Sequence, residues 1–222
     1  MPVPPVALTK SAYAYDEIRR RILTGEIPQG SVLSQAQMAQ EIGVSTTPLR
    51  EALRRLAAEG MVQLESHRDA RVTPLTADEA RDLYLIRESL DPMAAGLAAA
   101  GRTDGDIAAI KDSLKRLAPL SAAADLEAMT AHREFHRAVY TASHNPLLIG
   151  ILEGLWDKAD RYRQVGLNSQ KDSARDRARV QKEHEEIADA VIAGDADRAR
   201  EAMRRHVVGS LGRRAIGVLE SA

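Results

Sequence analysis

The sequence of 222 residues contains no cysteine. Disulfides, thiolate zinc sites and cysteine nucleophiles are therefore excluded. Aromatic residues make up only 3% of the chain, so the core must consist of Ala, Leu, Ile, Val and Met, a composition that favours helices. The sequence also lacks an apolar run of about 18 residues and a signal-peptide pattern. These absences predict a cytoplasmic protein with no membrane partner.

An excess of positive charge is missing as well. The formal net charge is −1 at pH 7, although 28% of the residues are charged. Many polyanion-binding proteins are strongly basic. DNA binding by this chain would therefore have to depend on a local patch and a particular shape, with a dimer to double the contacts.

Regions with different patterns follow one another along the chain. Residues 1–9 contain three prolines without periodicity and are predicted to form a disordered arm. Residues 10–75 combine short amphipathic helices with two extended segments, whereas residues 76–222 contain no strand candidate. We therefore expect a mostly α protein, in which a small N-terminal domain precedes an all-α, antiparallel six-helix bundle.

Turn signals mark the ends of the predicted bundle helices. These helices are expected at 77–100, 104–117, 122–142, 145–166, 173–193 and 196–218. At the start of the first, Thr76 and Glu79 have the spacing of a capping box.

Residues 10–75 carry the pattern of a winged helix-turn-helix. Helices are predicted at 11–23, at 35–41 and from position 46 or 47 to 59. Gly43 suits the sharp turn before the last of them, and the segments MVQLES and ARVTPL are consistent with a hairpin wing. In this motif the second helix of the pair enters the major groove end-on, so its first turn reaches bases and phosphates.

Several polar side chains of this domain are expected to contact DNA. They are Ser45, Thr46, Thr47 and Arg50 at the start of the recognition helix, Arg54 further along it, and Arg68 and Arg71 in the wing. Arg50 can pair with guanine or with a phosphate, and the wing arginines can reach the minor groove or phosphates. The alternative is that this arginine-rich helix is only a solvated surface.

Four of the six histidines lie where helices can bring them together. His132 and His136 are one helical turn apart and project from the same helix face. His184 and His206 belong to two further helices, and three helices of a bundle can converge on one interior point. Neutral imidazoles favour zinc, nickel, copper or iron over magnesium and calcium. The pattern therefore indicates a divalent transition metal, zinc or nickel first, although a single histidine is more often an ordinary core or surface residue.

The segment LSQAQMAQEIGVSTTPLREALRRLAAEGMVQLESHRDARV resembles the DNA-binding domain of the GntR family of bacterial regulators. The signature residues matched in register are Gly43, Val44, Ser45, Pro48, Arg50, Glu51, Ala52, Leu53, Leu56, Glu59 and Gly60. The chain departs from the family where Thr46 replaces a basic residue, Gln35 a glutamate and Met38 a leucine. Asp69 replaces the wing glycine. The resemblance implies binding to a double-stranded DNA operator.

Residues 77–218 resemble the FCD ligand-binding domain of the FadR-like branch of that family. The matching segments are DLYLIRESLDPMAAGLAA, HREFHRAVYTASHNP and HEEIADAVIAGDADRAREAMRRH. In metal-containing members the ligands are an Asp or Asn, a His one turn later and two further His. The resemblance implies that His136, His184 and His206 are ligands. His132 stands where the Asp or Asn is usual, so the site would consist of four imidazoles.

The resemblance also implies a small organic acid as effector, whose carboxylate completes the coordination of the metal. Arg87 matches the family's arginine that helps to hold this anion, although as a bare sequence feature it can equally pair with Glu88 or Asp91. The weaker effector-binding candidates are Arg161, Arg163 and Asn168.

The leading hypothesis is a ligand-responsive transcriptional regulator, in its commoner form a repressor, that binds a near-palindromic operator as a homodimer. The main alternative is a metal-dependent hydrolase with Glu134 or Glu183 as general base, but it leaves the first 75 residues unexplained. A third hypothesis is a metal that only stabilises the bundle. In that case metal removal would lower the melting temperature, and organic acids would change nothing.

Overall fold

The computed structural model divides into two compact units, residues 1–74 and 75–222. The residues that it describes are 9–65, 69–117, 120, 126–168 and 174–221. The expected disordered arm therefore lies outside the described residues except for Thr9, and Arg68 of the wing lies outside them as well.

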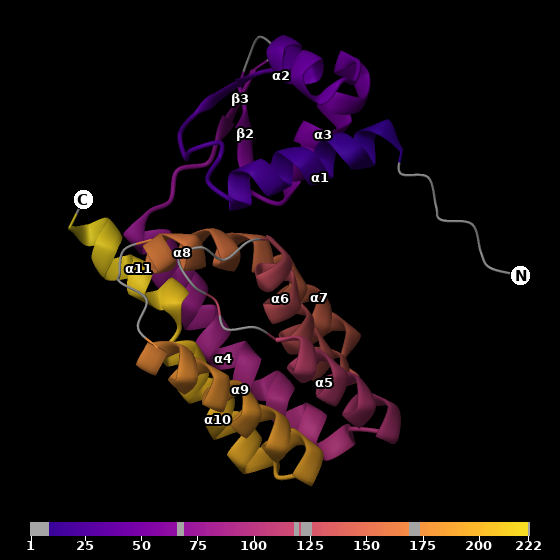
Figure 1. Ribbon diagram of the computed structural model, residues 1–222, viewed down its shortest axis with the longest axis vertical. Helices are drawn as coiled ribbons and strands as arrows, with labels where there is room; N and C mark the ends of the chain where they lie inside the picture. The colour runs from indigo at the N-terminus through magenta and orange to yellow at the C-terminus, as the bar shows by residue number, and fades with distance from the viewer. Residues whose placement is uncertain (1–8, 66–68, 118–119, 121–125, 169–173, 222) are drawn as a thin grey trace, which may run out of the picture. The chain divides into compact units, whose positions relative to one another are not determined.

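The N-terminal unit is a winged helix-turn-helix (Figure 1). Its elements are α1 (Lys10–Leu23), β1 (Val32–Ser34), α2 (Gln35–Ile42), α3 (Thr46–Ala58), β2 (Val62–Leu64) and β3 (Asp69–Val72). Helices α1 and α3 pack against each other, and Leu49, Leu53 and Leu56 of α3 are fully buried. Gly43 ends α2 in the left-handed conformation that glycine adopts without strain. The predicted motif is confirmed.

The small sheet has one strand more than the sequence predicted. β3 lies between β1 and β2 and is antiparallel to both, with Val32 opposite Arg71 and Val62 opposite Val72. The two predicted extended segments thus did not include Val32 and Leu33. A three-residue strand is too short to show alternation, and β1 forms because β3 offers it a hydrogen-bonding edge.

The C-terminal unit is an assembly of helices, as predicted. They are α4 (Ala77–Gly101), α5 (Asp104–Arg116), α6 (Leu126–Thr141), α7 (Pro146–Gly154), α8 (Trp156–Asn168), α9 (Ala174–Ala193), α10 (Ala196–Val208) and α11 (Leu211–Glu220). The described residues thus form eight helices, not six. The helix predicted over 196–218 ends at Gly209, where Ser210 caps α11 by accepting a hydrogen bond from the Arg213 amide. The helix predicted over 145–166 divides at Leu155, and the apolar pattern continues through that break.

Only one of the two hydrogen bonds of the expected capping box forms at the start of α4. The Thr76 hydroxyl accepts a hydrogen bond from the Glu79 amide at 3.1 Å. The Glu79 carboxylate instead lies 2.6 Å from Lys158 Nζ and accepts a hydrogen bond from the Tyr162 hydroxyl at 2.7 Å. Glu79 therefore joins α4 to α8, because two donors outside its own helix turn compete for it.

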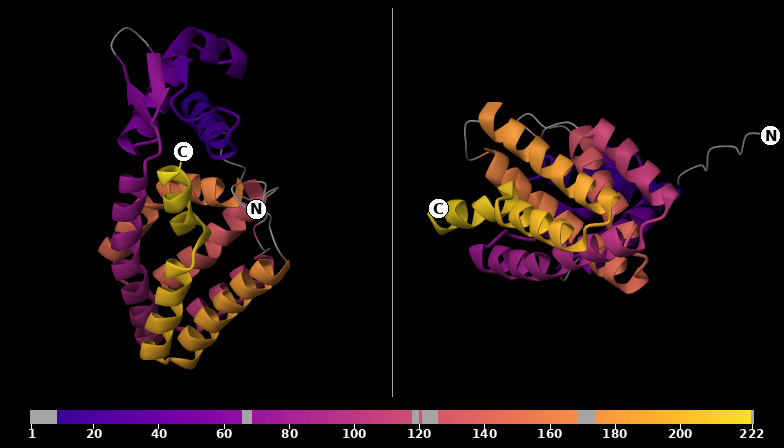
Figure 2. Two further views of the ribbon diagram at one scale, coloured as in Figure 1. Left: turned by 90° about the vertical axis from the view of Figure 1, so that its left-hand side faces the viewer. Right: turned by 90° about the horizontal axis from the view of Figure 1, so that it is seen from below.

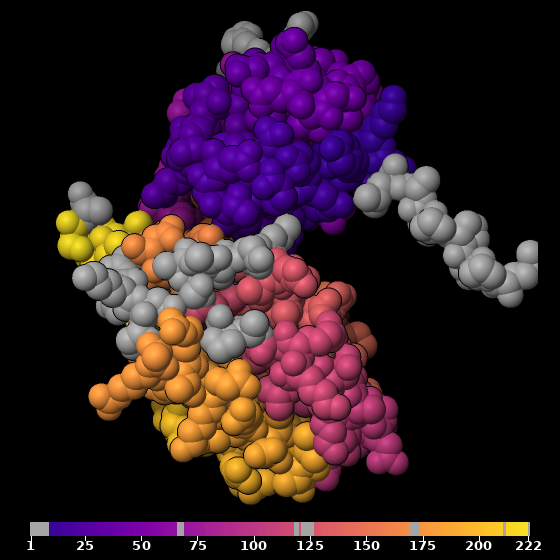
Figure 3. Space-filling model, viewed as in Figure 1, coloured from indigo at the N-terminus to yellow at the C-terminus, as the bar shows by residue number. Residues whose placement is uncertain are grey.

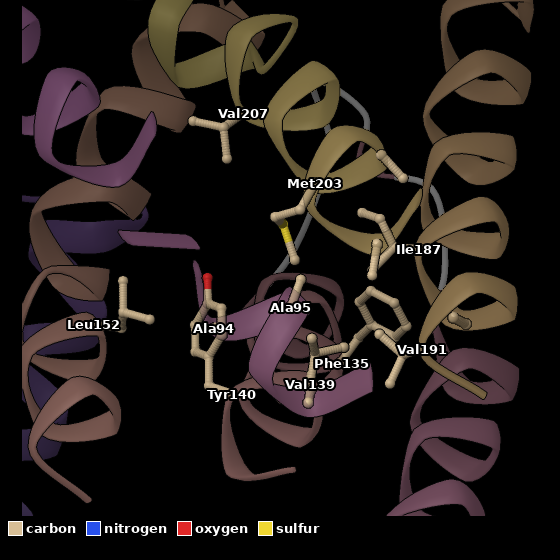
Figure 4. Packing of buried hydrophobic residues seen from close by; sticks show 14 of the residues in the cluster. Ala94, Ala95, Phe135, Val139, Tyr140, Leu152, Ile187, Val191, Met203 and Val207 are labelled. Atoms are coloured by element: carbon tan, nitrogen blue, oxygen red, sulfur yellow. The ribbon is translucent and has the colours of Figure 1, made fainter. Parts of the chain in front are cut away.

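The core of this unit lies between α4 and the helices around it (Figure 4). Four alanines of α4, Ala94, Ala95, Ala98 and Ala99, have no exposed surface. Small side chains allow close helix packing, and α10 runs beside α4 in Figure 2. Phe135 of α6 fills the space beside Ile187 and Val191 of α9.

In the space-filling view, α9 lies between α5 and α10 on the surface of the C-terminal unit (Figure 3). None of the described helices is both long and apolar enough to cross a membrane.

Candidate metal centre and DNA-reading surface

Four histidine side chains meet inside the C-terminal unit. His132 and His136 come from α6, His184 from α9 and His206 from α10. All four are buried, with exposed fractions between 0 and 5%. One ring nitrogen of each lies within 4.8 Å of those of the others. Three helices thus supply one group of imidazoles that is small enough to surround a single ion.

Hydrogen bonds at Nδ1 orient two of these rings. His184 Nδ1 lies 2.8 Å from the Val180 carbonyl oxygen, which can only accept, so Nδ1 is the donor. His206 Nδ1 lies 3.1 Å from a Glu183 carboxylate oxygen. Hydrogen bonds of this kind fix the tautomer and direct Nε2 toward a metal. Glu183 therefore acts here as a partner of His206, and the hydrolase hypothesis loses one of its two candidate bases.

Burial favours the neutral form of three of these imidazoles. It lowers the pKa of His132, His136 and His184 well below the ordinary value, and positive charges nearby lower it further. Those positive charges are the guanidinium groups of Arg87 and Arg163 and any neighbouring imidazole that is protonated. A neutral imidazole has a free nitrogen lone pair, which is the form that binds metals.

The donor atoms of the cluster fit a divalent transition metal. His132 Nδ1, both ring nitrogens of His136 and His184 Nε2 are buried without a hydrogen-bond partner. Unpaired polar atoms are costly in a protein interior, and a metal ion bound by one nitrogen of each ring would give a partner to most of these atoms. Imidazole nitrogens suit zinc, nickel, copper or iron, whereas magnesium and calcium require oxygen ligands.

Arg87 lies beside this cluster, on α4. Its Nη2 and Nε donate hydrogen bonds to Asp91 Oδ2 at 2.6 and 3.2 Å, and the Tyr140 hydroxyl donates to the same oxygen at 3.0 Å. Burial opposes the positive charge of Arg87, but the Asp91 carboxylate outweighs it, so the Arg87 pKa is raised. Arg87 is thus a permanent, paired cation at the site.

The three weaker effector-binding candidates differ in burial and in their neighbours. Arg163 of α8 is buried, forms an ion pair with Asp160, and lies 5.3 Å from the centroid of the Trp156 ring, which also neighbours Arg87 at 5.1 Å. By contrast, burial lowers the pKa of Arg161, against the opposing effect of Tyr162 and Glu79. Asn168 is exposed at the end of α8.

Arg163 is therefore the arginine of α8 that lies near the histidines, with its positive charge acting on His132 and His136. The spacing of Trp156, Asp160 and Arg163, one and two turns apart on α8, is the sequence signal that would have favoured it over Arg161.

In the N-terminal unit, the start of the recognition helix α3 is exposed. Ser45, Thr46, Thr47 and Arg50 all face solvent, as does Arg54 one turn beyond Arg50. Ser45 is the N-cap residue, but its side chain makes no capping hydrogen bond. Its hydroxyl thus remains available beside a helix N-terminus, a position that favours phosphate.

The arginines of this unit differ in the groups that their guanidinium groups contact. Arg50 Nε donates to Gln35 Oε1 at 3.0 Å, and Arg71 of the wing binds Glu65 at 2.6 Å and the Gly30 carbonyl at 2.9 Å. Arg55 lies 3.6 Å over the ring of Tyr15, where it links α3 to α1. Arg55 therefore has a structural role in this unit.

Comparison with known proteins assigns both units. Residues 10–72 match bacterial regulatory proteins of the gntR family, and residues 82–209 match the FCD domain. The chain is 31% identical to the transcriptional regulator LutR of Bacillus subtilis, over 84% of this chain and 92% of LutR. It is 28% identical to the transcriptional repressor GlaR of Escherichia coli, over 87% and 90% of the two chains.

Solved structures agree on the fold. Escherichia coli McbR/YncC superposes with a TM-score of 0.76, at 22% sequence identity, over 97% of this chain and 99% of that one. The chain therefore belongs to the GntR family of bacterial regulatory proteins with a C-terminal FCD domain, a family of DNA-binding transcription regulators rather than of enzymes.

Proposed function

We propose that this protein is a homodimeric transcriptional repressor that senses a small carboxylate at a metal ion held by His132, His136, His184 and His206. The observation that carries the proposal is the buried group of four imidazoles in the FCD domain. When bound, the metal would supply a Lewis-acidic centre for an anionic ligand. The name of its relative GlaR, a transcriptional repressor, supports repression as the mode of action.

The proposed route from effector to DNA begins at Arg87. Its guanidinium is buried beside the histidines and lies on α4, the helix that follows the DNA-reading unit directly in the chain. An anion that binds both the metal and Arg87 would join α4 to α6, α9 and α10. Effector binding would then change operator affinity through α4, with a coupling of typically ~1–3 kcal/mol.

The function is tested on an operator that has first been mapped by selection from DNA fragments. We expect the metal-loaded protein to bind this operator, and one member of a panel of small carboxylates to weaken binding by about 5- to 150-fold. A chelator should abolish the response to the carboxylate. If chelation lowers the melting temperature while every carboxylate leaves DNA binding unchanged, the metal is structural and the sensor proposal is wrong.

The same assay tests the reading helix. Arg50→Ala should weaken operator binding by about 1–3 kcal/mol, because a pair between arginine and guanine is lost. Arg55→Ala is the matched control on the same helix, since Arg55 is held by the Tyr15 ring. Arg50→Ala with wild-type affinity would contradict the assignment of α3.

For the homodimer, we propose that α4 and α7 provide the contact surface. All exposed residues of α4 between positions 85 and 100 are uncharged, and four of them are large and apolar: Leu85, Ile86, Met93 and Leu97. On α7, which packs against α4, the exposed residues are uncharged too, and Leu147 and Ile151 are 81% and 53% exposed. Contiguous apolar surface of this kind marks an interaction site.

A second copy of the chain is the occupant that this face fits. The apolar stretch extends about 22 Å along α4, so two copies related by a two-fold axis would cover apolar surface with apolar surface and bury no charge. A two-fold axis is also the symmetry of a near-palindromic operator.

Met93→Glu tests this interface. We expect the variant to be a folded monomer by light scattering and circular dichroism, because the dimer would have to bury two unpaired carboxylates. Operator affinity should fall by at least about tenfold, since each monomer reads one half-site. Val208→Glu, which alters an apolar residue on α10 that is 39% exposed, should leave the dimer intact. A Met93→Glu protein that remains dimeric would contradict the proposed interface.

A further inference from the structure

We propose that the effector is a doubly charged anion, such as a small dicarboxylate, rather than a monocarboxylate. This inference rests on the proposed metal centre and names the class of ligand that the centre selects. It follows from the charges around the four histidines and from their positions.

The two arginines beside the cluster are each neutralised by a carboxylate of their own. Arg87 is paired with Asp91, and Arg163 is paired with Asp160. All four of these side chains are at least nine-tenths buried. Neither carboxylate belongs to the group of side chains that can hold the metal. The negative charge of each carboxylate thus neutralises its own arginine. Neither carboxylate is then available to neutralise the charge of a metal ion.

A third carboxylate, that of Glu183, is also paired. Glu183 accepts a hydrogen bond from His206 and forms an ion pair with Arg179. Its charge is therefore also balanced by a cation of the protein.

A divalent metal in this cluster would keep both of its positive charges. The proposed ligands are neutral imidazoles, and no carboxylate of the described residues joins them. An uncompensated charge in a protein interior is costly. The two missing negative charges must then come from solution, and one dianion supplies both at the entropic cost of a single bound molecule.

The arrangement of the arginines also fits a ligand with two anionic ends. Arg87 of α4 and Arg163 of α8 lie 5.1 and 5.3 Å from the centroid of the same Trp156 ring. The rings of His132 and His136 neighbour that tryptophan as well, with centroids 5.8 and 5.3 Å from its own. Two guanidinium groups from different helices therefore border one group of metal ligands.

His132 is the residue on which this selectivity can be tested, because changing it alters the charge of the site directly. His132→Asp would add one negative charge to the ligand group, whereas His132→Asn would place an oxygen of the same size there without a charge. The two variants form a matched pair that differs only in charge.

The experiment compares zinc-loaded wild-type protein with both variants at neutral pH and constant ionic strength. Binding of malonate and succinate is measured by calorimetry against acetate and propanoate, and retained zinc is determined after each titration. In the wild type and in His132→Asn, we expect the dicarboxylates to bind at least about tenfold more tightly than the monocarboxylates. In His132→Asp the preference should shrink by about tenfold or more.

Four results would overturn the inference. The first is a wild type with no preference for the dicarboxylates, and the second is an equal change of preference in His132→Asp and His132→Asn. Zinc-loaded protein that binds no carboxylate overturns the inference and leaves the metal centre standing. A wild type that retains no zinc, nickel, copper or iron overturns the proposed metal centre itself, and the inference with it.

Discussion

Replacing His184 and His206 together by alanine is expected to remove metal binding almost completely. These two residues supply the rings whose Nδ1 atoms are fixed by Val180 and Glu183. Their loss would leave only the two imidazoles of α6. Because loss of an orienting partner alone typically lowers metal affinity by about 10- to 100-fold, removal of two ligands should lower it by more than about 100-fold.

Metal content after dialysis, measured by elemental analysis, provides the readout. The control is His144→Ala, since His144 is about half exposed and bonds to Asp106 at 2.9 Å rather than joining the cluster. His144→Ala should retain the wild-type metal content. A double variant that retains full metal content would show that the ion is bound elsewhere. Circular dichroism establishes that the variant is folded.

A second large effect is expected from Asp91→Ala, a change that leaves Arg87 charged and buried. Asp91 has no exposed surface, and its Oδ2 accepts hydrogen bonds from Arg87 and Tyr140. Removing one partner of a buried ion pair typically costs about 3–5 kcal/mol. We expect a loss of this size in the free energy of unfolding, measured by urea denaturation of the metal-free protein.

The matched control removes both charges. Arg87→Met combined with Asp91→Leu replaces the pair by apolar side chains, which is often neutral or stabilising. The double variant should therefore be more stable than Asp91→Ala alone. If Asp91→Ala unfolds at the wild-type urea concentration, Arg87 does not depend on this carboxylate. The double variant should also lose its response to the effector, because the anion loses Arg87.

The DNA-reading motif was predictable because its signals are local. Gly43 permits a left-handed turn, and a proline such as Pro48 is tolerated only in the first turn of a helix. Strand β1 was missed since its three residues depend on a partner 35 to 39 positions away in the chain, where Arg71 faces Val32.

The cluster of four histidines was also foreseeable, in part from helical periodicity and in part from family resemblance. The spacing of His132 and His136 places both on one face of α6 whatever the rest of the chain does. The choice between Arg161 and Arg163, by contrast, depends on which side of α8 faces the histidines. Adjacent arginines on a helix point in directions that periodicity distinguishes only when the buried face is known.

The sequence by itself determined most of the helices, among them the recognition helix, and the histidine pair, because caps, turns and i,i+4 spacing act over a few residues. The tertiary structure decided which charges are already paired, with Arg87 on Asp91, Arg163 on Asp160 and Glu183 on His206. Of these, the pairing of Glu183 with His206 joins different helices, α9 and α10. Helix packing decides whether a site lacks negative charge, because burial and distance set the strength of the interaction between any two charges.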